Sequence, residues 1–88
     1  MLKATTTIIN KAGLHARAAA KLVELTGGLE SAIQIGHNKM VDGKSILSLM
    51  MLAAVQGTEI SIEVDGADEE RAMSAVLKLI ENRFDEAE

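Results

Sequence analysis

The stretch "TEISIEVDG", residues 58–66, alternates almost perfectly between apolar and polar side chains. Ile60, Ile62 and Val64 point to one side of an extended chain, and the polar residues between them point to the other, because successive side chains of a strand face opposite ways. The stretch therefore predicts a strand that is buried on one face and exposed to solvent on the other.

Directly after this strand the pattern changes its period. Over residues 68–84, apolar side chains recur at helical spacing, at Ala72, Val76, Leu79 and Ile80. The acidic residues that open the segment suit the positive end of a helix dipole. We therefore expect a final helix, followed by an acidic tail "DEAE" that ends the chain in solvent.

The N-terminal part of the chain also reads as a strand followed by a helix. Residues 2–9 alternate, and their threonines and isoleucines favour strands. Gly13 marks a turn, and a helix is predicted over residues 16–26, ended by Gly27 and Gly28. The apolar face of that helix consists of Ala19, Leu22, Val23 and Thr26.

Between these parts, the sequence predicts a hairpin and a short helix. Residues 33–35 alternate, "GHNK" (36–39) has the composition of a turn, and a third short strand begins at Met40. Ser45 is a favoured residue at a helix N-cap. In the helix that follows it, Leu49 and Leu52 are expected to face inward. The other face carries Ile46, Leu47 and Met50.

The predicted order is strand, helix, strand, strand, helix, strand, helix. Two strand–helix–strand units with one-faced strands indicate an α+β fold, in which an antiparallel sheet is covered by helices on one face. The chain has 88 residues, enough for a single domain over 1–88. Phe84 is its only aromatic residue, so the core must be aliphatic.

The composition argues against several functions. The net charge is −4, and a nucleic-acid binder would need a basic face and stacking aromatics. The chain has no cysteine, which excludes disulfides and thiolate-bound metals. It shows neither a signal segment nor an apolar run long enough to span a membrane. We therefore expect a cytoplasmic protein without membrane insertion, metal or cofactor.

His15 lies where the first helix begins, in "NKAGLHARAAAKLVELTGG" (10–28). The simplest interpretation is an ordinary loop residue or helix cap. A metal site is disfavoured because His37, the other histidine, lies in a predicted hairpin and no histidine cluster occurs. A Ser/His/Asp triad is disfavoured because no nucleophile motif is present.

A fourth interpretation follows from the position of His15. The unpaired N–H groups of a helix start and the guanidinium of Arg17 together favour an anion. A neutral imidazole beside such a site can accept a phosphoryl group on a ring nitrogen and pass it on, because a phosphoramidate forms and breaks readily.

Three segments resemble HPr, the histidine-phosphorylated carrier family of the bacterial phosphoenolpyruvate phosphotransferase system. "GLHARAAAKLV" (13–23) is similar to its active-site segment, and "VDGKSILSLMMLAA" (41–54) to its regulatory-serine helix. "QGTEISIEVDGADEERA" (56–72) is similar to its last strand and the start of its final helix. The resemblance covers essentially the whole chain and implies an open-faced sandwich of four antiparallel strands and three helices.

The resemblance also implies roles for individual residues. His15 would carry the phosphoryl group, Arg17 would stabilise it, and the backbone amides of Ala16 and Arg17 would bind it. Ser45 would be the site of a regulatory kinase and phosphorylase that some bacteria possess. The donor would be phosphorylated enzyme I and the acceptor an enzyme IIA-type protein, with the carrier itself a monomer and not an enzyme.

Ala18 departs from the family pattern, because many members that serve sugar uptake have proline there. Alanine is the best helix former and should preserve the first turn. Alanine at this position is also similar to members of the nitrogen-related branch. The resemblance therefore does not decide between sugar uptake and the nitrogen-related branch, but it implies a phosphoryl carrier in either case.

The exposed face of the short second helix has two interpretations. Its residues Ile46, Leu47, Met50 and Met51 could belong to the core, the usual place of methionine-rich runs. A helix this short cannot bury every side, so we expect Ile46, Leu47 and Met50, together with Ala20, to dock partner proteins.

Two other functions remain compatible with the sequence. One is a small-ligand-binding regulatory domain of split strand–helix–strand type. The other is an HPr paralogue that acts by binding alone, although an intact His15 and Arg17 argue against it.

Overall fold

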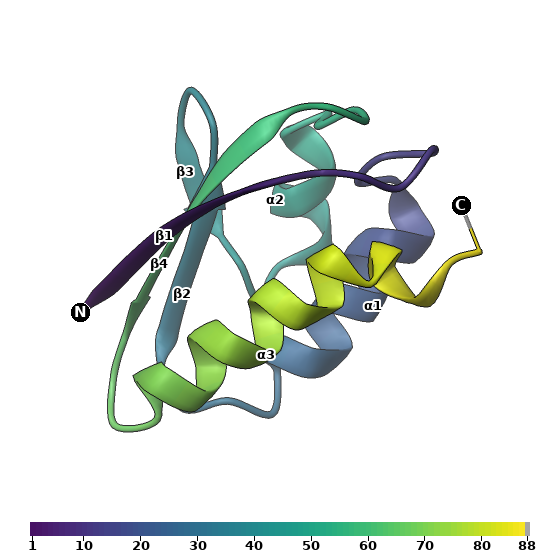
Figure 1. The fold of residues 1–88 in the computed structure, drawn as a ribbon. Helices are drawn as coiled ribbons and strands as arrows, with labels where there is room; N and C mark the ends of the chain where they lie inside the picture. Colours follow the sequence, from purple (N-terminus) through teal and green to yellow (C-terminus); the bar gives the residue numbers. More distant parts are fainter. Residues whose placement is uncertain (88) are drawn as a thin grey trace.

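In the computed structural model, which describes residues 1–87, strands and helices follow one another in the predicted order. Figure 1 shows the helices packed on one side of a twisted sheet. The elements are β1 (Leu2–Thr7), α1 (Ala16–Thr26), β2 (Ala32–Gly36), β3 (Met40–Asp42), α2 (Ile46–Met51), β4 (Glu59–Asp65) and α3 (Glu69–Glu81).

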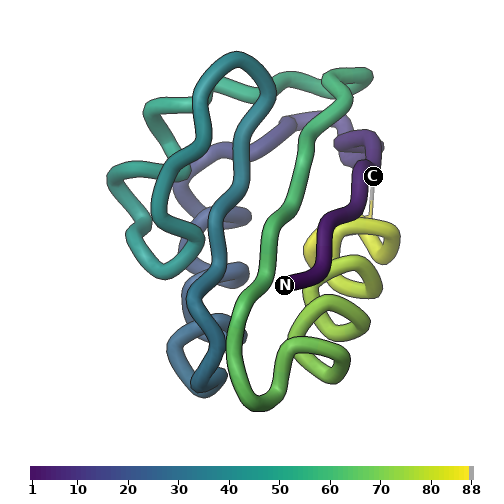
Figure 2. The backbone as a smooth tube through the Cα atoms, turned by 90° about the vertical axis from the view of Figure 1, so that its left-hand side faces the viewer, coloured from purple at the N-terminus to yellow at the C-terminus, as the bar shows by residue number. Residues whose placement is uncertain are grey.

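The four strands form one antiparallel sheet in the order β1-β4-β2-β3. Figure 2 shows β4 running between β2 and β1. The register places inward-facing side chains next to one another across the sheet. Ile62 of β4, for example, lies between Ala4 of β1 and Ile35 of β2. The alternation of "TEISIEVDG" is therefore confirmed, and the fold is the expected α+β sandwich.

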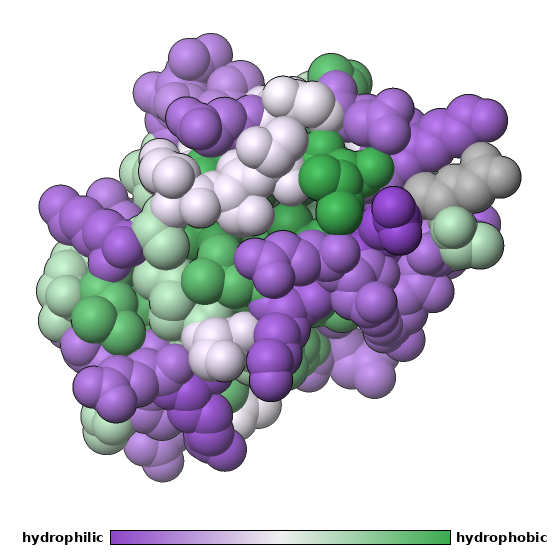
Figure 3. All heavy atoms as spheres, in the orientation of Figure 1, coloured by the Kyte–Doolittle hydropathy of each residue, from purple (hydrophilic) through white to green (hydrophobic). Residues whose placement is uncertain are grey.

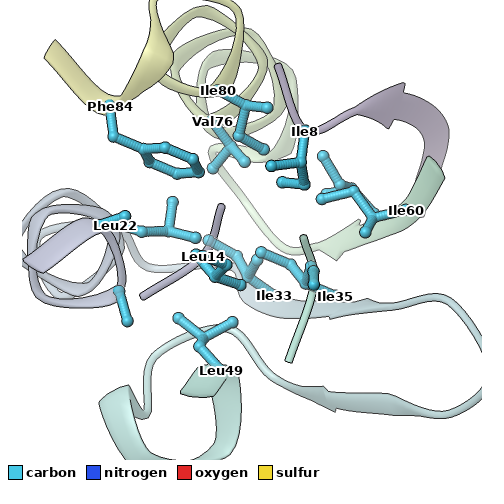
Figure 4. Close-up of a cluster of buried hydrophobic side chains, with 14 of the residues drawn as sticks. Ile8, Leu14, Leu22, Ile33, Ile35, Leu49, Ile60, Val76, Ile80 and Phe84 are labelled. Atoms are coloured by element: carbon cyan, nitrogen blue, oxygen red, sulfur yellow. The ribbon is translucent and has the colours of Figure 1, made fainter. Parts of the chain in front are cut away.

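The core lies between the sheet and the helices and is almost entirely aliphatic. Leu49 of α2 points toward Leu14 and Ile33, while Phe84 packs beside Val76 and Ile80 (Figure 4). Leu49 is 0% exposed. The space-filling view in Figure 3 shows hydrophilic residues over much of the face that carries β1 and α3, with hydrophobic atoms exposed between them. No helix within residues 1–87 is long and apolar enough to cross a membrane.

The ends of two elements differ from the predictions. β1 ends at Thr7 rather than at residue 9, although Ile8 continues the alternation and is buried. α3 ends at Glu81 rather than at residue 84, because the chain then turns out of the helix. Gly27 does cap α1, but with φ −62° it is helical and not left-handed.

Asp68 ties the start of α3 to the loop before β2. Its carboxylate accepts a hydrogen bond from the Ser31 hydroxyl, and it also accepts from the backbone N–H groups of Glu30 and Ser31, both at 2.9 Å. It makes no side-chain capping bond to α3 itself. These hydrogen bonds hold the pKa of Asp68 well below its usual range, and the bond from the Ser31 hydroxyl contributes most.

Replacing Asp68 with asparagine should therefore lower the free energy of unfolding in a pH-dependent way. A carboxyl whose pKa is depressed by folding adds stability that is present above its unfolded pKa, about 3.9, and lost as the pH falls through the folded value. Urea unfolding should show the full difference at neutral pH and a shrinking one in strong acid. Glu70→Gln, a change at an exposed carboxylate on the same turn, serves as the control. A difference independent of pH would contradict this role.

Candidate functional site

The loop before α1 is held firmly against the chain that follows α2. Gly13 has φ +72°, and a Cβ there would lie 2.6 Å from the carbonyl oxygen of Ala54. The next residue, Leu14, donates its N–H to that same carbonyl at 2.8 Å and buries its side chain. Only glycine combines this conformation with this close approach. The loop therefore delivers His15 to a fixed position.

His15 is the N-cap of α1, as its position in the sequence indicated. Its backbone is extended, and its Nδ1 accepts a hydrogen bond from the N–H of Arg17 at 3.2 Å. Its carbonyl accepts from the N–H of Ala19 at 2.8 Å. A ring nitrogen accepts a hydrogen bond only through a lone pair. Nδ1 is therefore unprotonated in this geometry.

The other ring nitrogen contacts the C-terminal segment. Nε2 of His15 lies 2.6 Å from Oε2 of Glu86. Because Nδ1 carries no proton, the neutral ring carries it on Nε2 and donates it to the carboxylate. The side chains are 29% and 18% exposed, so the pair is reachable but largely shielded.

Asn10 donates a second hydrogen bond to this carboxylate. The side chain of Asn10 is completely buried, and its amide nitrogen donates to the Gly13 carbonyl at 2.8 Å and to Oε1 of Glu86 at 2.9 Å. The bond from Asn10 lowers the pKa of Glu86 most, with further contributions from His15 and the charge of Arg17, against the opposing effect of burial. Glu86 is therefore ionised at neutral pH.

A left-handed turn, η1 (Arg83–Asp85), carries the chain from the end of α3 back to His15. Its residues have φ values of 58°, 53° and 62°, which cost non-glycine residues roughly 1–2 kcal/mol each. Phe84 is buried in the core, and Asp85 pairs with Lys21 of α1 at 3.5 Å. Figures 1 and 2 both show this yellow segment beside the purple loop that precedes α1.

A shallow depression opens at this junction, with three basic residues along it. Lys11, Arg17 and Lys21 line it together with His15, facing the acidic residues of the C-terminal segment. The start of a helix and a cluster of basic side chains both favour an anion. Within residues 1–87, no group of three or more His, Asp or Glu side chains is placed to hold a metal ion.

The structure places the remaining predicted residues largely as expected. Ser45 caps α2, because its hydroxyl accepts from the N–H of Ser48 at 3.2 Å. Ala18 is buried in the first turn of α1, which forms without proline. His37 is exposed in the β2–β3 turn, with Nε2 at 3.3 Å from the Leu52 carbonyl.

The exposed face of α2 is also confirmed. Leu47 is 70% exposed and Ile46 and Met50 are both 41% exposed, while Ala20 is exposed on α1. Leu49 is fully buried and Leu52 partly so, as the spacing predicted. α2 packs against α1 on the same side of the sheet.

Glu86 and Asn10, which form the hydrogen bonds beside His15, were not identified from the sequence. The tail "DEAE" was expected to be solvated, but Glu86 contacts His15 and Asp85 pairs with Lys21; Glu88 lies outside the described residues. Asn10 carried no signal beyond its place at the end of a strand. Glu86 is 71 residues from His15 in the chain, and no local pattern reports such a contact.

Comparison with known proteins identifies the family of the chain. A family model described as "PTS HPr component phosphorylation site" matches residues 2–82. The phosphocarrier protein HPr of Cupriavidus necator is 54% identical over the full length of both chains, and that of Pseudomonas aeruginosa is 51% identical over 93% of each. A crystal structure of HPr-C-His from Thermoanaerobacter tengcongensis superposes with a TM-score of 0.95 at 39% identity, over the whole of both chains.

These findings define the chain as a phosphocarrier of the phosphotransferase system, a protein that carries a group and is not itself an enzyme. It belongs to the HPr family.

Proposed function

We propose that His15 accepts a phosphoryl group from phosphorylated enzyme I on Nδ1 and passes it to an enzyme IIA-type protein. The observation that carries this proposal is the lone pair of Nδ1, held at the start of α1 by the N–H of Arg17. A nucleophile needs such a lone pair, and the transferred group needs donors where its charge will lie.

The transfer step is a displacement at phosphorus. The Nδ1 lone pair forms a bond to phosphorus, and the bond between phosphorus and the donor breaks, with its electron pair leaving on the donor. The ring keeps its proton on Nε2 and gains a positive charge. The same step in reverse hands the group to the acceptor, which regenerates neutral His15.

The start of α1 would bind the oxygens of the phosphoryl group. The Arg17 N–H that now donates to Nδ1 becomes available once Nδ1 is bonded to phosphorus. It would then turn to a phosphoryl oxygen, together with the N–H of Ala16. The exposed guanidinium of Arg17 adds a charge-assisted contact from the solvent side.

The exposed face of α2 would dock both partners. Ile46, Leu47 and Met50 form an apolar surface, which Ala20 extends onto α1. Methionine adapts its shape to different contacts, which suits a carrier that meets donor and acceptor in turn. The N–H of Leu14, the residue before His15, donates to the carbonyl of Ala54, three residues beyond the end of α2. This bond links the His15 loop to the chain that follows α2.

Ser45 would act as the regulatory site where a serine kinase and phosphorylase exist. Its hydroxyl is partly exposed at the start of α2, directly before Ile46 and Leu47. A phosphate there would add close to two negative charges beside the docking surface and oppose an apolar encounter.

Arg17→Ala should slow phosphoryl transfer without unfolding the protein. The lost contact is a charge-assisted hydrogen bond, on the order of 1.5–3 kcal/mol, which corresponds to roughly a tenfold to hundredfold lower rate. Arg17→Lys should fall between, because an ammonium retains the charge but not the planar fork. Quenched-flow transfer from phosphorylated enzyme I measures these rates.

The matched control is Lys78→Ala, which removes an exposed basic residue from α3. It should transfer at the wild-type rate. Equal rates for the wild type, Arg17→Ala and Arg17→Lys would remove Arg17 from the site.

A further inference from the structure

We infer that Glu86 is a positioning residue for phosphoryl transfer: its carboxylate keeps the proton of His15 on Nε2 and neutralises the charge that the ring gains when Nδ1 takes the phosphoryl group. This inference rests on the proposed function of His15 as the acceptor. It gives the C-terminal segment a part in the chemistry, in place of the solvated end that its composition suggests.

The first part of this role concerns the tautomer of His15. A neutral imidazole carries one proton, which can sit on either nitrogen, and only the Nε2–H form leaves a lone pair on Nδ1. Two contacts select this form from opposite sides of the ring. The N–H of Arg17 donates to Nδ1 at 3.2 Å, and Oε2 of Glu86 lies 2.6 Å from Nε2.

The second part concerns charge. Once Nδ1 is bonded to phosphorus and Nε2 keeps its proton, the ring is a cation. Glu86 already lies at hydrogen-bond distance in a largely shielded position, so it pairs with that cation without moving. A carboxylate that orients an imidazole and stabilises its cation serves the same two purposes in serine hydrolases.

Asn10 fixes which way this carboxylate is presented. Its amide nitrogen donates both to the Gly13 carbonyl and to Oε1 of Glu86. Rotating the amide by half a turn would place its oxygen against the Gly13 carbonyl, with two acceptors facing each other. Asn10 therefore always offers a donor to residue 86, which must meet it with an oxygen.

This asymmetry makes Glu86→Gln an informative variant. The glutamine oxygen must face Asn10, so its NH₂ group faces Nε2 of His15 and donates to it. That contact favours the opposite tautomer, with the proton on Nδ1, where it meets the N–H of Arg17. Glu86→Ala instead removes the contact and leaves Arg17 alone to select the tautomer.

The experiment combines transfer rates with nitrogen NMR of His15. The expected order of rates is wild type, then Glu86→Ala, then Glu86→Gln, with the last slower than the wild type by roughly tenfold to a hundredfold. Glu86→Asp, which retains the carboxylate, should be faster than Glu86→Gln. Glu81→Gln, a change at an exposed glutamate on α3, should match the wild type.

The NMR measurement needs no enzyme I and is made at mildly alkaline pH, where a free imidazole is neutral. The ¹⁵N shifts of wild-type His15 should show a protonated Nε2 and an unprotonated Nδ1, and Glu86→Gln should move the proton toward Nδ1. Wild-type rates for both Glu86→Gln and Glu86→Ala, or an even mixture of tautomers in the wild type, would overturn the inference. A wild-type chain that takes no phosphoryl group would instead overturn the proposed function.

Discussion

Replacing His15 with alanine is expected to abolish phosphoryl transfer to the chain while leaving its fold intact. In the proposed transfer the group is accepted by the Nδ1 lone pair at the start of α1, which this variant lacks. The structural cost is small, because the change removes one capping bond and one partly exposed contact to Glu86. Losing an N-cap typically costs about 0.5–2 kcal/mol.

The measurement is labelling from phosphoenolpyruvate in the presence of magnesium and enzyme I, alongside a thermal melt. His37→Ala is the matched control, because His37 is the other histidine and lies in an exposed turn. It should label fully. Label that persists in His15→Ala, or that is lost in His37→Ala, would place the acceptor elsewhere.

Leu49→Glu is expected to unfold the protein, whereas Leu47→Glu should leave it folded and weaken its encounters with partners. Leu49 is 0% exposed, and a carboxylate in that position would be buried without a partner. The penalty for an unpaired buried charge is several kcal/mol, comparable to the 5–15 kcal/mol total stability typical of a domain. Leu47 is 70% exposed, so its replacement changes only the surface.

Melting curves separate the two variants, and chemical-shift mapping with enzyme I tests the docking surface. Met50→Glu should resemble Leu47→Glu, and Ser45→Asp should weaken docking less, because a carboxylate carries less charge than a phosphate. If Leu47→Glu bound enzyme I as tightly as the wild type, the exposed face of α2 would not be the docking surface.

The fold could be predicted from the sequence because its signals are local. Strand alternation, the bounds of α1 and the burial of Leu49 follow from side-chain period and from residues that begin or end helices. The end of α3 was predicted three residues too late, because Phe84 fits the helical spacing. The chain instead buries this ring from a left-handed turn.

Only part of the candidate site could be predicted, because only some of its contacts join residues that are close in sequence. His15 and Arg17 are close in sequence, and a helix start brings them together. Asn10 and Glu86 meet at His15 only after α3 has packed and the turn at its end has reversed the chain. The tie between Asp68 and Ser31 was missed likewise, because it joins segments 37 residues apart.

The proposal that this chain carries phosphate on a histidine is decided by intact mass measured before and after acid treatment. The wild-type protein is incubated with phosphoenolpyruvate, magnesium and enzyme I, and its mass should rise by one phosphoryl group. Brief acidification should remove that group, because a phosphoramidate is labile in acid whereas a serine phosphate is stable. An unchanged mass after incubation, or an added group that survives acid, would contradict phosphoryl transfer through His15.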